Sequence, residues 1–140
     1  MKIFGVIEFF RGSFHYMEME GKFNGEPYTT FLKKALSQYN CPVIPVEDGA
    51  PYHGARVVKN FVENEGQDRL SIYRLPSYSP DFNPIEKLWK NTKRDATHCK
   101  FFPTFDDIRT SVVKTFKKYM QDDNKVICVM KKLRNCAGVA

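Results

Sequence analysis

The stretch LPSYSPDFNPIEKLW, residues 75–89, combines a proline-rich loop with the start of a helix. Pro76, Pro80 and Pro84 restrict the backbone of this loop. Asn83 fits a helix N-cap and Pro84 the first helical position. Glu86 fits the third position, from which a glutamate can accept the backbone N–H of the cap. The pattern predicts a helix, PIEKLWKNTKRDAT, over residues 84–97.

Upstream of this stretch, the chain begins with a strand pattern. Residues 2–10 and 13–23 are rich in β-branched and aromatic side chains, and Arg11-Gly12 separates them. Two such runs around a short glycine-containing turn predict an antiparallel hairpin.

Helix and strand patterns then alternate. Apolar spacing and end signals predict helices, and short apolar runs predict strands, in the order helix 26–39, strand 42–46, helix 55–66, strand 70–76, helix 84–97 and helix 104–120. Alternation of this kind indicates parallel strands, and the hairpin adds antiparallel ones. We therefore expect an α/β fold with one mixed sheet. Pro42 and Pro45 should lie at the start of their strand or on an unpaired edge.

Composition limits the classes of function. The 140 residues suit one domain, and 22 Lys+Arg against 16 Asp+Glu give a net charge of +6, which favours a polyanionic partner. The four cysteines form no C-x-x-C pair, so we expect reduced thiols in a cytoplasmic protein. No apolar run has the length of a membrane span, so we expect no membrane partner.

Two carboxylates occupy positions suited to chemistry. Asp48 comes where the chain leaves a strand, and ligands bind beyond the carboxyl ends of strands in open α/β sheets. A turn-forming aspartate and a helix-capping Glu86 are the structural alternatives. Paired carboxylates that hold two Mg²⁺ ions would serve phosphoryl chemistry, because the ions activate a water or 3′-hydroxyl and stabilise the leaving oxygen.

The segments VEDGAPYHGA and LPSYSPDFNPIEKLWKNTKRD together resemble the DDE-superfamily transposases of the mariner-like bacterial insertion sequences. The resemblance implies an RNase H-like mixed sheet with helices on both faces. It also implies a site of three carboxylates that binds Mg²⁺ or Mn²⁺, with two ions in the intact site. Asp48 matches the second carboxylate of the family and Glu86 the third. The implied activity is cleavage and transfer of DNA strands at transposon ends and target DNA.

The chain departs from the family pattern in two places. The first Asp of the family lies on a strand before the hairpin, and no residue matches it or the DNA-binding helix-turn-helix region. We therefore expect residues 1–140 to be a truncated catalytic domain whose first strand is missing and which is inactive alone. One alternative is a catalytically dead remnant that only binds DNA or pairs with a full-length transposase or an upstream-frame polypeptide. Another is a housekeeping RNase H-like nuclease.

Further residues have candidate roles. His53 would contact a phosphate or metal-bound water, or be an ordinary polar residue at a helix start. Tyr52 and Tyr78 would stack on a base or pack internally, and Trp89 would hold its helix against the sheet. Basic side chains on the helix of Glu86 are candidates for phosphate contact because DNA must reach that residue: Lys87, Lys90, Lys93 and Arg94.

Overall fold

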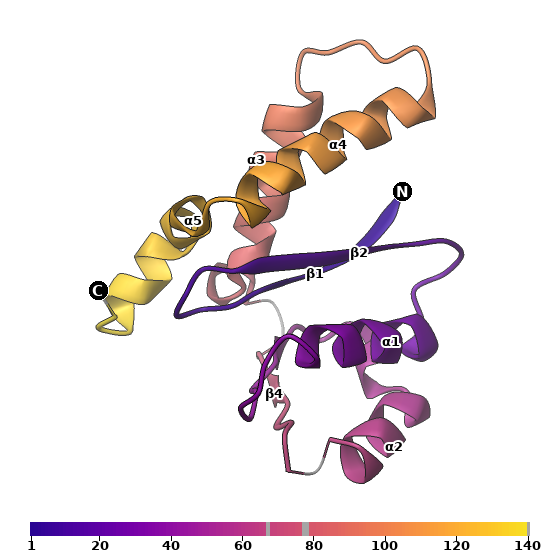
Figure 1. Ribbon diagram of the computed structural model, residues 1–140, viewed down its shortest axis with the longest axis vertical. Coiled ribbons are helices and arrows are strands. Elements are labelled where there is room, and N and C mark those ends of the chain that lie inside the picture. The colour runs from indigo at the N-terminus through magenta and orange to yellow at the C-terminus, as the bar shows by residue number, and fades with distance from the viewer. Residues whose placement is uncertain (67, 77–78, 140) are drawn as a thin grey trace. The chain divides into compact units, whose positions relative to one another are not determined.

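The computed structural model describes residues 1–66, 68–76 and 79–139, which form α-helices and short strands (Figure 1). In chain order these are β1 (Lys2–Ile7), β2 (Phe14–Met19), α1 (Gly25–Leu36), β3 (Val46–Glu47), the 3-10 turn η1 (Pro51–Gly54), α2 (Arg56–Asn64), β4 (Tyr73–Arg74), the 3-10 turn η2 (Pro80–Phe82), α3 (Pro84–Thr97), α4 (Phe105–Met120) and α5 (Asp123–Cys136). No helix among these is long and apolar enough to span a membrane.

The chain divides into two compact units. The first comprises Met1–Phe4 and Tyr16–Asn83, and the second comprises Gly5–His15 and Pro84–Ala140. The hairpin therefore contributes its open end to the first unit and its turn to the second.

The predicted hairpin is confirmed, with β1 and β2 paired as neighbours (Figure 1). Gly12 adopts φ +83° in the turn, a conformation that favours glycine. The carboxylate of Glu8 accepts backbone N–H groups from Phe10 and Arg11. Glu8, the acidic residue nearest to the start of the chain, is thus used to stabilise the turn.

The first unit packs α1 against α2 over an apolar core. The buried side chains are Phe4, Tyr28, Phe31, Leu32, Val58, Phe61 and Leu70. Asn24 caps α1 as its side chain accepts the N–H of Glu26. The helices predicted over 26–39 and 55–66 are confirmed as α1 and α2, whose C-terminal ends lie three and two residues earlier than predicted.

The two predicted central strands pair in parallel, with Val46 opposite Tyr73 and Glu47 opposite Arg74. The single mixed sheet is wrong for the described residues, which form two separate two-stranded sheets, β1-β2 and β3-β4. Pro45 gives the physical reason for the shortness of β3. Its carbonyl accepts from Tyr73, so its nitrogen faces the same partner strand but has no hydrogen to donate.

Of the two places expected for Pro45, the strand start applies, because it directly precedes β3 and its carbonyl faces the partner strand rather than an unpaired edge. The ladder is reduced to a bridge between Val43 and Leu70 and the two residue pairs of β3 and β4. The apolar run over residues 42–46 is partly exposed, since Ile44 is 67% and Val46 55% exposed.

The second unit is built on three helices, α3, α4 and α5. Helix α3 spans the predicted residues 84–97, and α4 begins after a capping box in which Thr104 and Asp107 exchange hydrogen bonds. The buried side chains are mainly apolar: Phe14, Leu88, Ala96, Val112, Phe116, Tyr119, Val126, Val129 and Met130. Helix α5 was not predicted, although Val126, Val129 and Met130 have helical spacing.

Candidate active site

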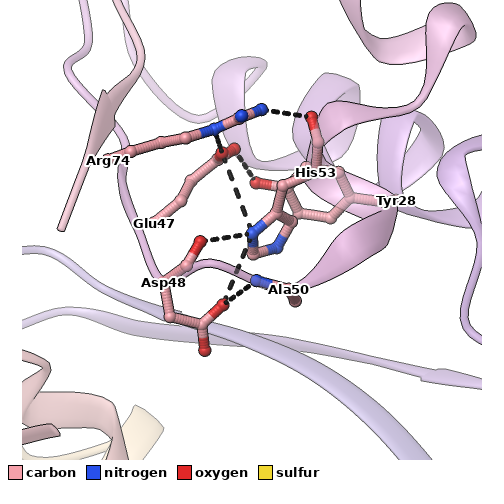
Figure 2. A network of polar contacts seen from close by, with 6 residues as sticks. All are labelled: Tyr28, Glu47, Asp48, Ala50, His53 and Arg74. Carbon is pink, nitrogen blue, oxygen red and sulfur yellow. Dashed lines mark hydrogen bonds and ion pairs between the residues drawn. The ribbon is translucent and has the colours of Figure 1, made fainter. Parts of the chain in front are cut away.

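Asp48 lies immediately after β3, where the chain turns into η1. Its Oδ1 atom accepts the backbone N–H of Ala50 at 3.1 Å, so the turn-forming role suggested by the sequence is real. The side chain is nevertheless 51% exposed. Figure 2 shows the second carboxylate oxygen directed away from the donors that hold the first. Asp48 can therefore shape the turn and still offer an oxygen to a ligand.

Glu47 precedes Asp48 and is buried, because successive side chains of a strand point to opposite sides. Its Oε1 atom accepts a hydrogen bond from the hydroxyl of Tyr28 on α1 (Figure 2). Its Oε2 atom has no hydrogen-bond partner in the described part of the chain. Nδ1 of His53 and Nε of the Arg74 guanidinium each lie 3.8 Å from Oε2.

His53 lies in η1 and joins the two acidic residues. Its Nδ1 atom is 2.9 Å from the backbone oxygen of Asp48 and 3.4 Å from Oδ1 of the same residue. The side chain of Arg74 on β4 donates to the backbone oxygen of His53 at 2.8 Å. The loop after β3 is thus tied to β4 through Arg74, and Glu47 at its start is tied to α1 through Tyr28.

The negative charge of this cluster affects the neighbouring phenols. Burial raises the pKa of Tyr28 well above its ordinary value, and the hydrogen bond to Glu47 raises it further. Burial also raises the pKa of Tyr52 to about 12, with additional contributions from Asp48 and Glu47. Both tyrosines therefore remain neutral hydrogen-bonding or packing groups at neutral pH.

Glu86 belongs to the second unit and lies in the first turn of α3, with its side chain exposed. The backbone N–H of Asn83, which a capping glutamate would accept, donates to the carbonyl of Pro80 at 3.1 Å. Trp89, one turn later, packs on the ring of Phe14 with centroids 6.1 Å apart. It also lies over Gly5, where an added Cβ would come within 2.5 Å of the indole. These contacts confirm that Trp89 holds α3 against the hairpin.

The predicted basic residues of α3 lie on its surface. Lys87, Lys90 and Lys93 are exposed, and Arg94 forms an ion pair with Asp95 at 2.8 Å. The hydrogen bond from Arg94 to Asp95 raises the pKa of the guanidinium, which stays charged. The three lysines are better placed for phosphate contact than Arg94, whose charge has a local partner.

The structure brings Asp48 and His53 together, and it assigns Glu86 and the basic residues to the other unit. The pairing of Asp48 with Glu86 remains a prediction. Among residues 1–66, 68–76 and 79–139, no three acidic, histidine or cysteine side chains are grouped so as to hold a metal ion. Tyr78 lies outside the described residues.

Three residues of the Asp48 cluster were missed by sequence reasoning: Tyr28, Glu47 and Arg74. Glu47 carried a signal, because a charged residue one position before Asp48 on a short strand must point to the opposite side from Asp48. Tyr28 and Arg74 carried none, since their contacts depend on how α1 and β4 pack against β3.

Comparisons with known proteins identify the family and a similar fold. A family model described as DDE superfamily endonuclease matches residues 1–109. The fold resembles the solved structure of the catalytic domain of Mos1 mariner transposase, with a TM-score of 0.59 and 19% identity. That similarity covers 92% of this chain and 69% of the other. A search of curated proteins found no match. Because the family match takes in most of the chain, including Asp48 and Glu86, the protein belongs to the DDE superfamily of endonucleases.

Proposed function

We propose that the chain is part of the catalytic domain of a DDE transposase of the mariner-like insertion-sequence group, acting in DNA strand cleavage and transfer. The observation that carries this proposal is the family match over residues 1–109, which includes both predicted carboxylates. The similarity in fold to the catalytic domain of Mos1 mariner transposase supports transposition as the setting.

Asp48 and Glu86 are the proposed metal ligands. Both side chains are exposed, and carboxylate oxygens are the donors that Mg²⁺ and Mn²⁺ prefer. When bound, such ions activate a water or 3′-hydroxyl and stabilise the departing oxygen. The contribution of this chain is to hold the two carboxylates. The turn at Ala50 fixes one oxygen of Asp48, and the packing of Trp89 fixes the helix that carries Glu86.

The exposed lysines of α3 are the proposed DNA contacts, together with Arg94. Replacement of Lys90, Lys93 and Arg94 with Ala should weaken duplex binding for all sequences and reduce its salt dependence, by up to about one unit of slope for each phosphate that is no longer neutralised. Replacement of Lys117 and Lys118 in the last turn of α4 is the control, and we expect little change in slope. An unchanged slope in the α3 variant would place DNA elsewhere or deny binding.

The activity test uses supercoiled plasmid with Mg²⁺ or Mn²⁺. The family site has three carboxylates, and residues 1–140 supply matches for two, so we expect no cleavage by this chain alone. Cleavage should appear when a segment carrying the first Asp of the family is supplied in cis or as a separate polypeptide. Asp48→Asn or Glu86→Gln should then abolish it. Cleavage that survives both substitutions would refute the proposed site. DNA binding without cleavage, even when that segment is supplied, would favour the binding-only alternative.

A further inference from the structure

Nδ1 of His53 is surrounded by oxygen atoms. The backbone oxygen of Asp48 lies at 2.9 Å, Oδ1 of Asp48 at 3.4 Å and Oε2 of Glu47 at 3.8 Å (Figure 2). A bare imidazole nitrogen at this place would direct its lone pair at the lone pairs of these oxygens, whereas an N–H group would donate to them. The geometry points to hydrogen on Nδ1. This assignment holds for the neutral and the protonated ring alike, because both forms with hydrogen on Nδ1 satisfy the same acceptors.

The ring of His53 has a fixed orientation. Its side chain is 8% exposed, and its centroid lies 4.5 Å from that of Tyr28 and 4.4 Å from that of Tyr52. Its backbone N–H donates to Ala50, and its backbone oxygen accepts from Arg74. The orientation of the Nδ1–H group toward Asp48 is consequently held by ring contacts with Tyr28 and Tyr52 and by hydrogen bonds on both sides of the His53 peptide.

Glu47 favours the same arrangement. Its buried carboxylate has one oxygen bonded to Tyr28 and the other without a hydrogen-bond partner among the described residues. That second oxygen lies on the Nδ1 side of the ring, where negative charge stabilises the N–H end of the imidazole. Glu47 thereby opposes the alternative tautomer with a bare Nδ1.

We propose that His53 is a positioning residue for Asp48: its Nδ1–H, with the N–H of Ala50, holds the backbone and one carboxylate oxygen so that the other oxygen is presented to the metal ion. The proposal rests on the proposed function for the metal itself. Second-layer hydrogen bonds of this kind orient ligating carboxylates, and their loss costs about 10–100-fold in metal affinity.

The first test needs no substitution and no metal. A long-range ¹H–¹⁵N spectrum of the ¹⁵N-labelled chain reports which nitrogen of each histidine carries hydrogen. It would be recorded above about pH 8, where an ordinary histidine is neutral. We expect hydrogen on Nδ1 of His53. A spectrum that shows a bare Nδ1 would overturn the inference, whatever the metal does.

The second test measures Mn²⁺ affinity by calorimetry. Asn places its amide nitrogen near the position of Nδ1, whereas the longer Gln side chain reaches toward that of Nε2. His53→Asn should retain affinity within about 2-fold, and His53→Gln should lose about 10-fold or more. Equal affinities of the two variants would overturn the positioning role. If circular dichroism shows that either variant is misfolded, the inference is tested by the ¹H–¹⁵N NMR spectrum of the unmodified chain, which needs no substitution.

Asp48→Asn separates this inference from the proposed function. If Asp48→Asn leaves Mn²⁺ affinity unchanged, the proposed metal site fails and the inference fails with it. If Asp48→Asn removes affinity while the two His53 variants bind equally well, the metal site stands and only the role of His53 is refuted.

Discussion

Substitution of Tyr28 by Phe tests whether the buried cluster beneath Asp48 is held together as described. The variant keeps the ring packing but removes the hydroxyl that donates to Glu47, a residue only 4% exposed. Since Oε2 has no hydrogen-bond partner among the described residues, the carboxylate would lose its hydrogen bond and keep only the side chains of His53 and Arg74 at 3.8 Å. A hydrogen bond to a charged group contributes about 1.5–3 kcal/mol, so we expect a loss of roughly 2 kcal/mol in the free energy of unfolding.

Urea denaturation measures this loss. With an m-value of about 2 kcal/mol per M, the midpoint should fall by roughly 1 M. In a Glu47→Gln background, the same Tyr28→Phe change should cost only about 0.5–1.5 kcal/mol, because the acceptor is then neutral. Tyr73→Phe, at a residue 58% exposed on β4, is the control and should change stability by less than about 0.5 kcal/mol. Equal costs of Tyr28→Phe in both backgrounds would refute the reasoning.

Three further predictions concern stability. Arg134→Met removes the buried guanidinium that donates to the carbonyls of the hairpin turn and should cost about 2–3 kcal/mol in urea unfolding; no loss would deny that role. Gly12→Ala should lower the free energy of unfolding more than Gly21→Ala does. Both glycines have positive φ, which costs an alanine about 1–2 kcal/mol, but only at Gly12 would the added Cβ meet a backbone oxygen, that of Asp123 at 2.7 Å. Tyr52, with its pKa raised to about 12, keeps its proton in the folded state while the unfolded chain loses it from about pH 10. Stability should therefore fall as pH rises from about 10 to 12, and Tyr52→Phe should make that fall shallower in pH-dependent urea unfolding.

Local signals in the sequence predicted most of the elements. The Asn83-Pro84 signal predicted the start of α3, and the apolar spacing and end signals over 104–120 predicted α4 to within one residue. Both depend on interactions within one helical turn. The choice between a strand start and an unpaired edge for Pro45 stayed open in the sequence, because it depends on which side of β3 the partner strand lies. That side is a tertiary property.

The part of the candidate site that depends on local sequence was predictable, and the part that depends on packing was not. Asp48 follows from its place at the end of a strand, and His53 from its nearness in sequence. The contact between Glu47 and Tyr28 joins residues 19 positions apart through the packing of α1. Sequence spacing has no period that would reveal such a contact, so the buried half of the cluster required the structure.

The central proposal is that Asp48 and Glu86 bind one metal ion together, and paramagnetic broadening by Mn²⁺ tests it most directly. Trace Mn²⁺ added to the ¹⁵N-labelled chain should broaden the backbone amide signals around Asp48 and around Glu86 at the same concentration. Asp48→Asn and Glu86→Gln should each reduce the broadening in both regions, because each removes a ligand of the shared site. Broadening in one region only, or loss in each variant confined to its own region, would contradict the claim.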